Sequence, residues 1–526
     1  MAAVDPKTAK ARLHAPGEIA CLDVREHGQY GEGHPFLAVP CPFSRLETSV
    51  AALVPRRNVP IVLVDHGDGV APRAALRLGG MGYSRVDWID GGAPAWRDAG
   101  YTLFKGVNGP SKTLGELVAE HWRVPSIGPE VLEAWRRDGR GVHLFDGRPG
   151  SEYAKMTIPG SRCIPNGELA HRWSAVVTDD ASAVVVNCAG RTRSILGAAG
   201  LMLLGASTVY ALENGTQGWA LSGRTLQHGA RPEPLPAPDL QDSRGRADAF
   251  ARERGIPWIT REIAQRLAFD ADRTTYLFDV RDPAEHAKTA HPAAPSAPGG
   301  QLVQATDQWI GVRRARVILA DDTGLRATLA AFWLRELGYE VHVLPDILSW
   351  PADWRLGPPD PPKVPELPRL DPVDAADAVA LARQGVALLD LRVSLVYRSA
   401  HLEGARWTTR ARLREHQHDS PVLLVGDPEP TALAALDLRE AGIWDVRRVA
   451  GCEREWHQDG VPLVASPREP SDAEAVDYLF FVHDRHDGNL EAAQRYLAWE
   501  TGLTTQLDQE EREEFRLETM NVSRSP

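Results

Sequence analysis

The 526-residue sequence predicts an α/β protein of four consecutive units, each a parallel sheet flanked by helices, followed by a short helical C-terminal extension. Three observations lead to this prediction. A hydrophobic run ending in Asp-x-Arg occurs four times, a tryptophan follows each run at a similar distance, and apolar strands alternate with helical stretches inside each unit. Strands that alternate with helices of about ten to fifteen residues are typical of a parallel sheet covered on both faces.

The repeats define the expected domains. The Asp-x-Arg runs are Leu22–Arg25, Phe145–Arg148, Phe278–Arg281 and Leu389–Arg392, and the closing tryptophans are Trp96, Trp219, Trp350 and Trp456. The distances from aspartate to tryptophan are 96 − 23 = 73, 219 − 146 = 73, 350 − 279 = 71 and 456 − 390 = 66 residues. This period is too long for a solenoid, so each copy is expected to be a domain with its own core. The expected domains are residues 5–108, 118–230, 250–358 and 370–466, with the extension at 470–526.

Inside each unit, the elements follow in the same order. After the Asp-x-Arg strand come a second strand, a helix, a short turn containing glycine and a further strand such as Val209–Leu212. The second strands are Ile61–Val64, Ala183–Val186, Val317–Ala320 and Val422–Val425. Linkers are expected where proline and glycine gather, around Gly106–Ser111, Arg231–Pro238 and Pro358–Pro368. Ligands of such sheets bind at the carboxyl ends of the strands, which directs attention to the residues after each second strand.

Cys188 is the residue at this place in the second unit. It ends the β-branched run from Val184, and a short loop with two arginines leads from it into a helix expected to begin at Ile195. Loop amides at a helix N-terminus and nearby guanidinium groups stabilise anions and lower the pKa of a thiol. The sequence therefore predicts a partly exposed, reactive thiol.

The other three units have no cysteine at this place. In the first unit the matching residue is His66 or, with a shift of one residue, Asp65. The third unit continues with Asp321-Asp322, and the fourth continues with Gly426-Asp427. Carboxylates repel an anionic sulfur donor and cannot carry a persulfide, so these three units are expected to be inactive.

The order of these motifs resembles the rhodanese family. The Asp-x-Arg strand, the Ile158–Ser161 segment, the six-residue loop led by Cys188 and the closing Gly-x-x-x-Trp all match the family's pattern. The resemblance implies a sulfurtransferase in which Cys188 takes sulfane sulfur from a small anionic donor such as thiosulfate and passes it, as a persulfide, to a thiol or cyanide. It also implies substrate binding by the loop that follows: Ala189, Gly190, Arg191, Thr192, Arg193 and Ser194.

Two alternatives follow from the same residues. The related dual-specificity phosphatases need Cys-x5-Arg, but the sixth residue after Cys188 is Ser194, which disfavours a phosphatase. The other alternative is a multi-rhodanese scaffold, or a sulfur-carrier or redox-sensing binding protein, with little turnover.

The Asp146–Arg148 pair could support the site from behind Cys188. The same pair occurs in the units that lack the cysteine, so a structural salt bridge is favoured. Glu152 and Tyr153 are further candidates for such supporting contacts, and the four tryptophans are expected to be packing residues.

Composition excludes several classes. A net charge of −12 gives no footprint for nucleic acid, and no apolar run is long enough to span a membrane. Five cysteines and an N-terminus without an apolar leader indicate the cytoplasm. No cofactor is predicted, no Cys/His cluster has metal spacing, and the sequence predicts no oligomeric state.

The extension is expected to contain a helix at Leu490–Thr501, with Asp508–Glu514 as a solvated acidic face. Just before this helix stand His483, Asp484, His486 and Asp487. These four could form a metal site, but a polar turn capping the helix is favoured.

Overall fold

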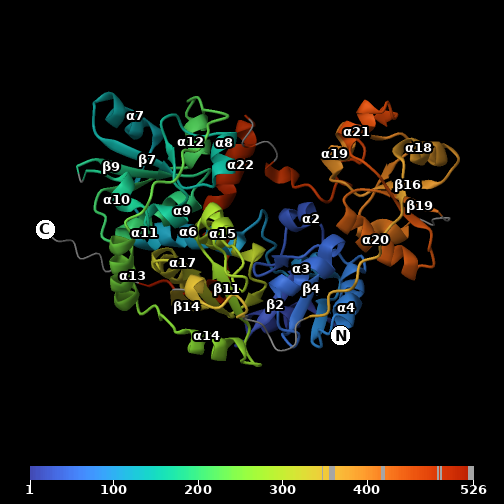
Figure 1. Ribbon diagram of the computed structural model, residues 1–526, viewed down its shortest axis with the longest axis horizontal. Coiled ribbons are helices and arrows are strands. Elements are labelled where there is room, and N and C mark those ends of the chain that lie inside the picture. The colour runs from blue at the N-terminus through green and yellow to red at the C-terminus, as the bar shows by residue number, and fades with distance from the viewer. Residues whose placement is uncertain are drawn as a thin grey trace.

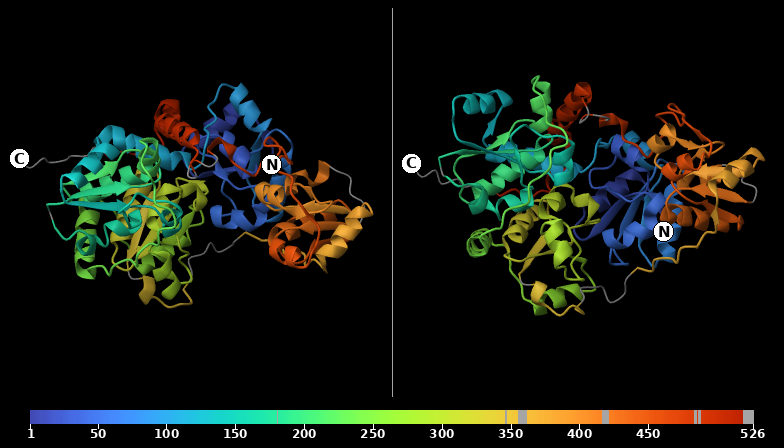
Figure 2. Two further views of the ribbon diagram at one scale, coloured as in Figure 1. Left: turned by 90° about the horizontal axis from the view of Figure 1, so that it is seen from above. Right: turned by 45° about the horizontal axis from the view of Figure 1, so that its top comes forward.

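The structure is a computed structural model that describes residues 1–179, 181–345, 347–354, 362–415, 421–482, 485 and 488–518. Over these residues the chain is a mixed α/β protein with four sheets of mainly parallel strands (Figure 1). The elements of the second and the fourth sheet lie on opposite sides of the molecule, those of the first sheet lie between them, and those of the third lie below the second in the view of Figure 1 (Figures 1 and 2).

The first sheet contains a strand from a distant part of the chain. Its strands are β1 (Ala3–Val4), β2 (Ile19–Asp23), β3 (Val39–Pro40), β4 (Ile61–Val64), β5 (Val86–Ile89) and β12 (Val312–Arg313). They run in the order β1-β5-β4-β2-β12, with β3 also paired to β2 and β12 antiparallel to it. The helices around this sheet are α1 (Pro6–His14), α2 (His27–Glu32), η1 (Phe43–Arg45), α3 (Leu46–Leu53), α4 (Val70–Gly80) and α5 (Gly92–Asp98). β12 pairs with Ile19 and Ala20 on the edge of β2 whose other end pairs with β3. Residues expected to belong to the third unit therefore complete the first sheet.

The second sheet is entirely parallel. Its strands are β6 (Ser126–Ile127), β7 (Val142–Asp146), β8 (Arg162–Cys163), β9 (Ala183–Asn187) and β10 (Val209–Leu212). Their order is β6-β10-β9-β7-β8, which places β9 at the centre. All five residues of β9 are buried, as its apolar sequence predicts for a strand covered on both faces. The surrounding helices are α6 (Gly109–Trp122), α7 (Pro129–Arg137), α8 (Gly150–Lys155), α9 (Asn166–Leu169), α10 (Trp173–Val176), α11 (Thr192–Leu203) and α12 (Gly215–Leu221).

The third sheet is the smallest of the four parallel sheets in the described residues. Its strands are β11 (Thr275–Asp279), β13 (Arg316–Asp321) and β14 (Glu340–Pro345), in the order β11-β13-β14. Single parallel bridges, Trp258 with Val343 and Asp279 with Ser296, take the places of the outer strands of the second sheet. The associated helices are α13 (Leu240–Arg254), α14 (Arg261–Ala268), α15 (Pro283–Lys288), α16 (Gly299–Gln304), η2 (Thr306–Gln308), α17 (Leu325–Glu336) and η3 (Ile347–Ser349).

The fourth sheet repeats the order of the second. Its strands are β15 (Pro372–Val373), β16 (Ala387–Asp390), β18 (Arg406–Trp407), β19 (Val422–Val425) and β20 (Val446–Val449), in the order β15-β20-β19-β16-β18. A separate antiparallel pair, β17 (His401–Leu402) and β21 (Leu463–Val464), lies beside it. Its helices are α18 (Ala375–Arg383), α19 (Ser394–Ser399), η4 (Arg410–Glu415), α20 (Pro428–Glu440) and α21 (Glu453–Gln458).

Two helices occupy the positions where domain boundaries were expected. Residue 118 lies inside α6 and residue 250 lies inside α13. Pro110, which was interpreted as part of a linker, stands in the first turn of α6, a position that proline also favours.

The C-terminal extension packs against the second sheet's helices. It contains η5 (Phe480–Val482), α22 (Leu490–Thr501), α23 (Leu503–Gln506) and α24 (Gln509–Arg512). The predicted helix at Leu490–Thr501 is confirmed, and Asn489 caps it by accepting the amide of Ala492 at 3.0 Å. Figure 1 shows α22 beside α12, and the two helices are in contact.

The expectation of a solvated acidic face in the extension is wrong for Glu511 and Glu514. Glu511 accepts a hydrogen bond from Lys10 Nζ at 2.7 Å, and Glu514 accepts one from Arg313 at 3.0 Å. Both carboxylates are buried because basic side chains of the first and third units neutralise them.

Buried ion pairs also join the units. Arg410 of η4 pairs with Glu47 of α3 at 2.6 Å and with Asp437 of α20 at 3.0 Å, which ties the fourth unit to the first. Arg326 of α17 pairs with Glu168 of α9 at 2.9 Å, which ties the third unit to the second. In the described part of the chain, no helix is both long enough and apolar enough to cross a membrane.

Candidate functional site

Cys188 follows the central strand β9 at the carboxyl edge of the second sheet, as the sequence predicts. The side chain is only 2% exposed, so the expectation of a partly exposed thiol is wrong. Instead, Cys188 lines a cavity of about 350 Å³. Its Sγ lies 3.6 Å from Ser194 Oγ, the one hydrogen-bond partner found for the thiol among the described residues.

The loop after Cys188 is held by α12. The Cys188 carbonyl accepts the amide of Thr216 at 2.8 Å, and the Ala189 carbonyl accepts the amide of Gln217 at 3.1 Å. Gly215 has φ +54°, and a Cβ built on it would lie 2.1 Å from the Cys188 carbonyl oxygen. A glycine is therefore required at residue 215 for this loop to close.

Helix α11 begins at Thr192, three residues earlier than the sequence predicts. The loop consequently consists of Ala189, Gly190 and Arg191, while Thr192, Arg193 and Ser194 form the first turn of the helix. The amides of a first helical turn have no partner within the helix, so they are available to an anion.

The strand register identifies the residues that match Cys188 in the other units. Asn187 pairs with Asp146, just as Val64 pairs with Asp23, so Asp65 and not His66 matches Cys188 in the first unit. The carbonyl of Asp65 also accepts an amide from the first turn of α5, at 2.9 Å from Ala93.

In the third and fourth units the same register applies. Asp279 pairs with Ala320, and Asp390 pairs with Val425. Asp321 and Gly426 therefore take the place of Cys188.

Both aspartates turn their carboxylates into their own loops. Asp65 accepts the amides of Gly67 and Ala71, each at 2.9 Å. Asp321 accepts the amides of Gly324 and, at 3.0 Å, Arg326. In both units the loop thus surrounds the carboxylate of the aspartate with backbone amides.

The two arginines of the Cys188 loop are already paired. Arg191 donates to both carboxylate oxygens of Glu116 on α6, at 2.7 and 2.8 Å. Arg193 donates to both oxygens of Glu152 on α8, each at 2.7 Å. Burial alone would lower the pKa of Arg193, but the Glu152 carboxylate raises it above its ordinary value. Each guanidinium is thus bound along its edge to a carboxylate, a geometry that fixes the loop.

The Asp-x-Arg pair forms the same clamp in all four units, buried in the first three and partly buried at Arg392 in the fourth. Arg148 Nη2 lies 2.7 Å from Asp146 Oδ2 and 2.6 Å from the carbonyl of Met156, eight residues further on. The other three arginines make the same two contacts, again with a carbonyl eight residues on: Arg25 with Asp23 and Gly33, Arg281 with Asp279 and Thr289, and Arg392 with Asp390 and Ala400. The clamp shapes the turn after the strand whether or not a cysteine is present. Tyr153 donates to the Ser161 carbonyl at 2.9 Å within the same turn.

The closing tryptophans also recur as packing residues. Trp96, Trp219 and Trp456 are buried, whereas Trp350 is partly buried against the third unit's core.

The cavity in front of Cys188 is built by segments that the sequence did not point to. Lys112 from α6, Gln301 and Gln304 from α16, and Tyr496, Trp499 and Glu500 from α22 all line it. Lys112 is 5% exposed and donates to the hydroxyl of Tyr496. The sequence indicates only that Tyr496 and Glu500, four residues apart, lie on one face of a helix. It does not indicate which part of the chain that face packs against.

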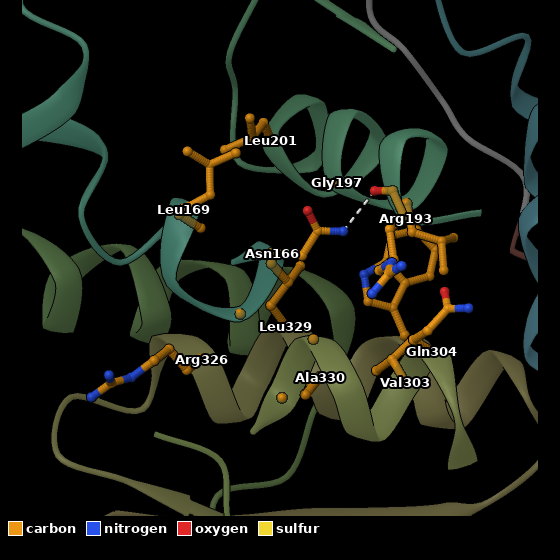
Figure 3. A pocket seen from close by; sticks show the side chains of 16 residues that line it. Asn166, Leu169, Arg193, Gly197, Leu201, Val303, Gln304, Arg326, Leu329 and Ala330 are labelled. Atoms are coloured by element: carbon orange, nitrogen blue, oxygen red, sulfur yellow. Dashed lines mark hydrogen bonds between the residues drawn. The ribbon is translucent and has the colours of Figure 1, made fainter. Parts of the chain in front are cut away.

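Helix α16 reaches this cavity because it approaches α9 very closely. A Cβ on Gly167 would lie 2.9 Å from the backbone nitrogen of Gly300, so only glycines permit the approach. Figure 3 shows the small pocket between these helices, where Asn166 Nδ2 donates to the carbonyl of Arg193 at 2.6 Å. The bond anchors the first turn of α11 from behind.

Metal ligation is not supported in the described part of the chain, where no group of three His, Cys, Asp or Glu residues could hold an ion. His483, Asp484, His486 and Asp487 lie outside the described residues. Among the other cysteines, Cys21, Cys41 and Cys163 are buried, and the exposed Cys452 stands at the N-terminus of α21.

Comparison with known proteins relates the chain to sulfur-transferring enzymes. The model of the rhodanese-like domain matches residues 5–99 and 129–222. A thiosulfate sulfurtransferase structure from Pseudomonas aeruginosa is 36% identical, covers 98% of this chain and 100% of its own, and superposes with a TM-score of 0.86.

Curated relatives match a shorter part. The "Putative thiosulfate sulfurtransferase SseB" of Mycobacterium tuberculosis, found in two strains, is 27% identical over 179 residues, or 31% of this chain. The match spans 61% of the length of these relatives.

Proposed function

The chain belongs to the rhodanese family, and from this premise we propose that it is a sulfurtransferase with one active unit, the second, in which Cys188 carries the transferred sulfur. The third and fourth units are rhodanese-like in the same proposal, because they repeat the Asp-x-Arg clamp and the strand register of the first two.

One observation carries the proposal. Asp65 and Asp321 stand where Cys188 stands, and their carboxylates accept the amides of their own loops. A persulfide on Cys188 would place one negative sulfur in the corresponding ring of amides from Ala189 to Ser194. Amides fixed in advance around a developing anion stabilise it without reorganisation.

The reaction is a double displacement. The Cys188 thiolate attacks the outer sulfur of thiosulfate, the sulfur–sulfur bond of the donor breaks, and sulfite leaves with the electron pair. An acceptor thiolate or cyanide then attacks the outer sulfur of the persulfide and releases the Cys188 thiolate. No oxidant or reductant enters the cycle.

The arginines take a supporting role in this proposal. Because Arg191 and Arg193 are each held along one edge by a carboxylate, we assign them to fixing the loop, and we assign the anionic end of the donor to the loop amides.

Intact-protein mass spectrometry tests the proposal. Thiosulfate is expected to add about 32 Da, the mass of one sulfur, to the wild type and nothing to Cys188→Ser, and cyanide is expected to remove the adduct. A wild-type protein that takes up no sulfur would contradict an enzymatic role. The scaffold alternative predicts that Cys188→Ser retains its binding to protein partners.

A further inference from the structure

The wall of the Cys188 cavity facing the thiol comes from the C-terminal extension. Phe481, Arg485, Tyr496, Trp499 and Glu500 line it together with Lys112 from α6. With about 350 Å³, the cavity falls in the size range of pockets for small organic ligands. It therefore has room for more than a thiosulfate ion.

Glu500 is the most informative residue of this wall. It is 1% exposed. Its Oε1 accepts a hydrogen bond from the hydroxyl of Thr192 at 2.8 Å and lies 3.5 Å from Lys112 Nζ. Its Oε2 is buried and has no hydrogen-bond partner among the described residues. A Cβ built on Gly190 would lie 2.7 Å from this Oε2, so the free oxygen faces the loop that follows Cys188.

A buried carboxylate oxygen without a partner is costly, and it is explained when a ligand supplies the missing donor. Since Oε2 belongs to a carboxylate, the matching group is an N–H donor, and a cationic N–H group makes the strongest such hydrogen bond. A protonated amine on the ligand fits this requirement.

The charges on the rest of the wall indicate a second ligand group. Lys112, Arg191 and Arg193 are each close to a carboxylate, at Glu500, Glu116 and Glu152 respectively. Arg485 lies over the ring of Tyr496 at 4.3 Å and has no acidic partner among the described residues. Among the described residues of the wall, one positive charge is thus left for an anionic ligand group such as a carboxylate.

We propose that the sulfur acceptor is an amino-acid-type thiol, whose ammonium group binds Glu500 Oε2 and whose carboxylate binds Arg485. The inference rests on the proposed function and names the substrate class of the same site. In the transfer step the acceptor thiolate forms a bond to the outer sulfur of the Cys188 persulfide, the Cys188 sulfur–sulfur bond breaks, and the Cys188 thiolate takes the electron pair. The proton of the acceptor thiol leaves to solvent before the attack.

Matched acceptors test the ammonium contact on the wild-type protein. The protein is loaded with thiosulfate, and the loss of the Cys188 adduct is followed by mass spectrometry with cysteamine or 2-mercaptoethanol at equal thiolate concentration. Cysteamine is expected to react at least about tenfold faster at subsaturating concentration, which corresponds to about 1.4 kcal/mol. The rates of adduct loss with L-cysteine and with cysteamine are compared in the same way, which tests the contact between the acceptor carboxylate and Arg485.

Variants with matched controls locate the effect. Glu500→Gln is expected to raise KM for cysteamine about tenfold and to leave 2-mercaptoethanol unchanged. Glu491→Gln, on the exposed face of the same helix, is expected to change neither. Arg485→Gln is expected to remove the advantage of L-cysteine, whereas Arg495→Gln on that exposed face retains it.

Two results would overturn the inference. Equal rates of cysteamine and 2-mercaptoethanol on the wild type would show that no group recognises the amine, whatever the variants do. An equal loss with both thiols in Glu500→Gln would assign Glu500 to loop structure alone. Because adduct formation is measured first, a protein that never takes up sulfur refutes the proposed function and is distinguished from one that loads normally but lacks the preference.

Discussion

Substituting Gly215 with alanine should disable sulfur uptake by moving Cys188. The added Cβ would lie 2.1 Å from the Cys188 carbonyl oxygen, whereas ordinary contacts begin at 3.4 Å. The two groups must therefore separate by about 3.4 − 2.1 = 1.3 Å. A displacement of about 1 Å at a reacting group can cost about 100-fold in rate, and we expect a loss of this order in the rate of persulfide formation.

The assay is a time course of the Cys188 mass increase after mixing with thiosulfate. The first unit provides the control, because Gly92 has φ +61° and its added Cβ would lie 2.4 Å from the carbonyl oxygen of Asp65. Gly92→Ala introduces the same kind of strain beside a loop without a cysteine. Both variants should melt at a lower temperature, but only Gly215→Ala should lose sulfur uptake. A Gly215→Ala protein that loads sulfur within twofold of the wild type would refute the reasoning.

Two further predictions concern stability. Burial raises the pKa of Glu26 from 4.5 to about 7, so the folded protein retains a proton that the unfolded chain releases between these pH values, and the free energy of unfolding falls as pH rises through this window. Glu26→Gln should therefore melt at a higher temperature than the wild type above pH 7 and at the same temperature below about pH 4.5; a constant difference across this range would contradict it. Arg410→Met leaves the buried carboxylates of Glu47 and Asp437 without this partner and should cost about 3–5 kcal/mol in urea unfolding. Its control, Arg383→Met in an exposed pair with Glu403, should change stability far less, and equal effects of the two would argue against the buried pair as the cause.

Local pattern was enough to predict the placement of Cys188. β9 is apolar up to Val186 because both of its faces are buried, so the end of the apolar run marks the end of the strand. Ligand sites of parallel sheets lie at the carboxyl ends of the strands, which is where Cys188 follows. The Asp-x-Arg clamp was also predictable, since a buried charge must find a partner nearby. The expectation that it is structural agrees with its presence beside Gly426, where no side chain stands in the place of Cys188.

The cavity itself could not be predicted from local pattern. Lys112 and Glu500 are 388 residues apart in sequence, and only the docking of α22 on α6 and α12 brings them together. Pro110 led to the interpretation of a linker where α6 begins, so the helix carrying Lys112 and Glu116 was missed. The setting of Cys188 has the same origin, because many of the residues that line its cavity come from the extension and the third unit.

The use of α22 as a wall has a consequence for the protein during its synthesis. The ribosome must add 500 − 188 = 312 residues after Cys188 before Glu500 exists. At roughly 5–20 residues per second this takes roughly 15–60 s, while domains near the N-terminus already fold. For that interval the nascent chain carries its thiol without the wall that later restricts access. The order of translation therefore makes the newly made protein more open to small oxidants and foreign thiols than the finished one.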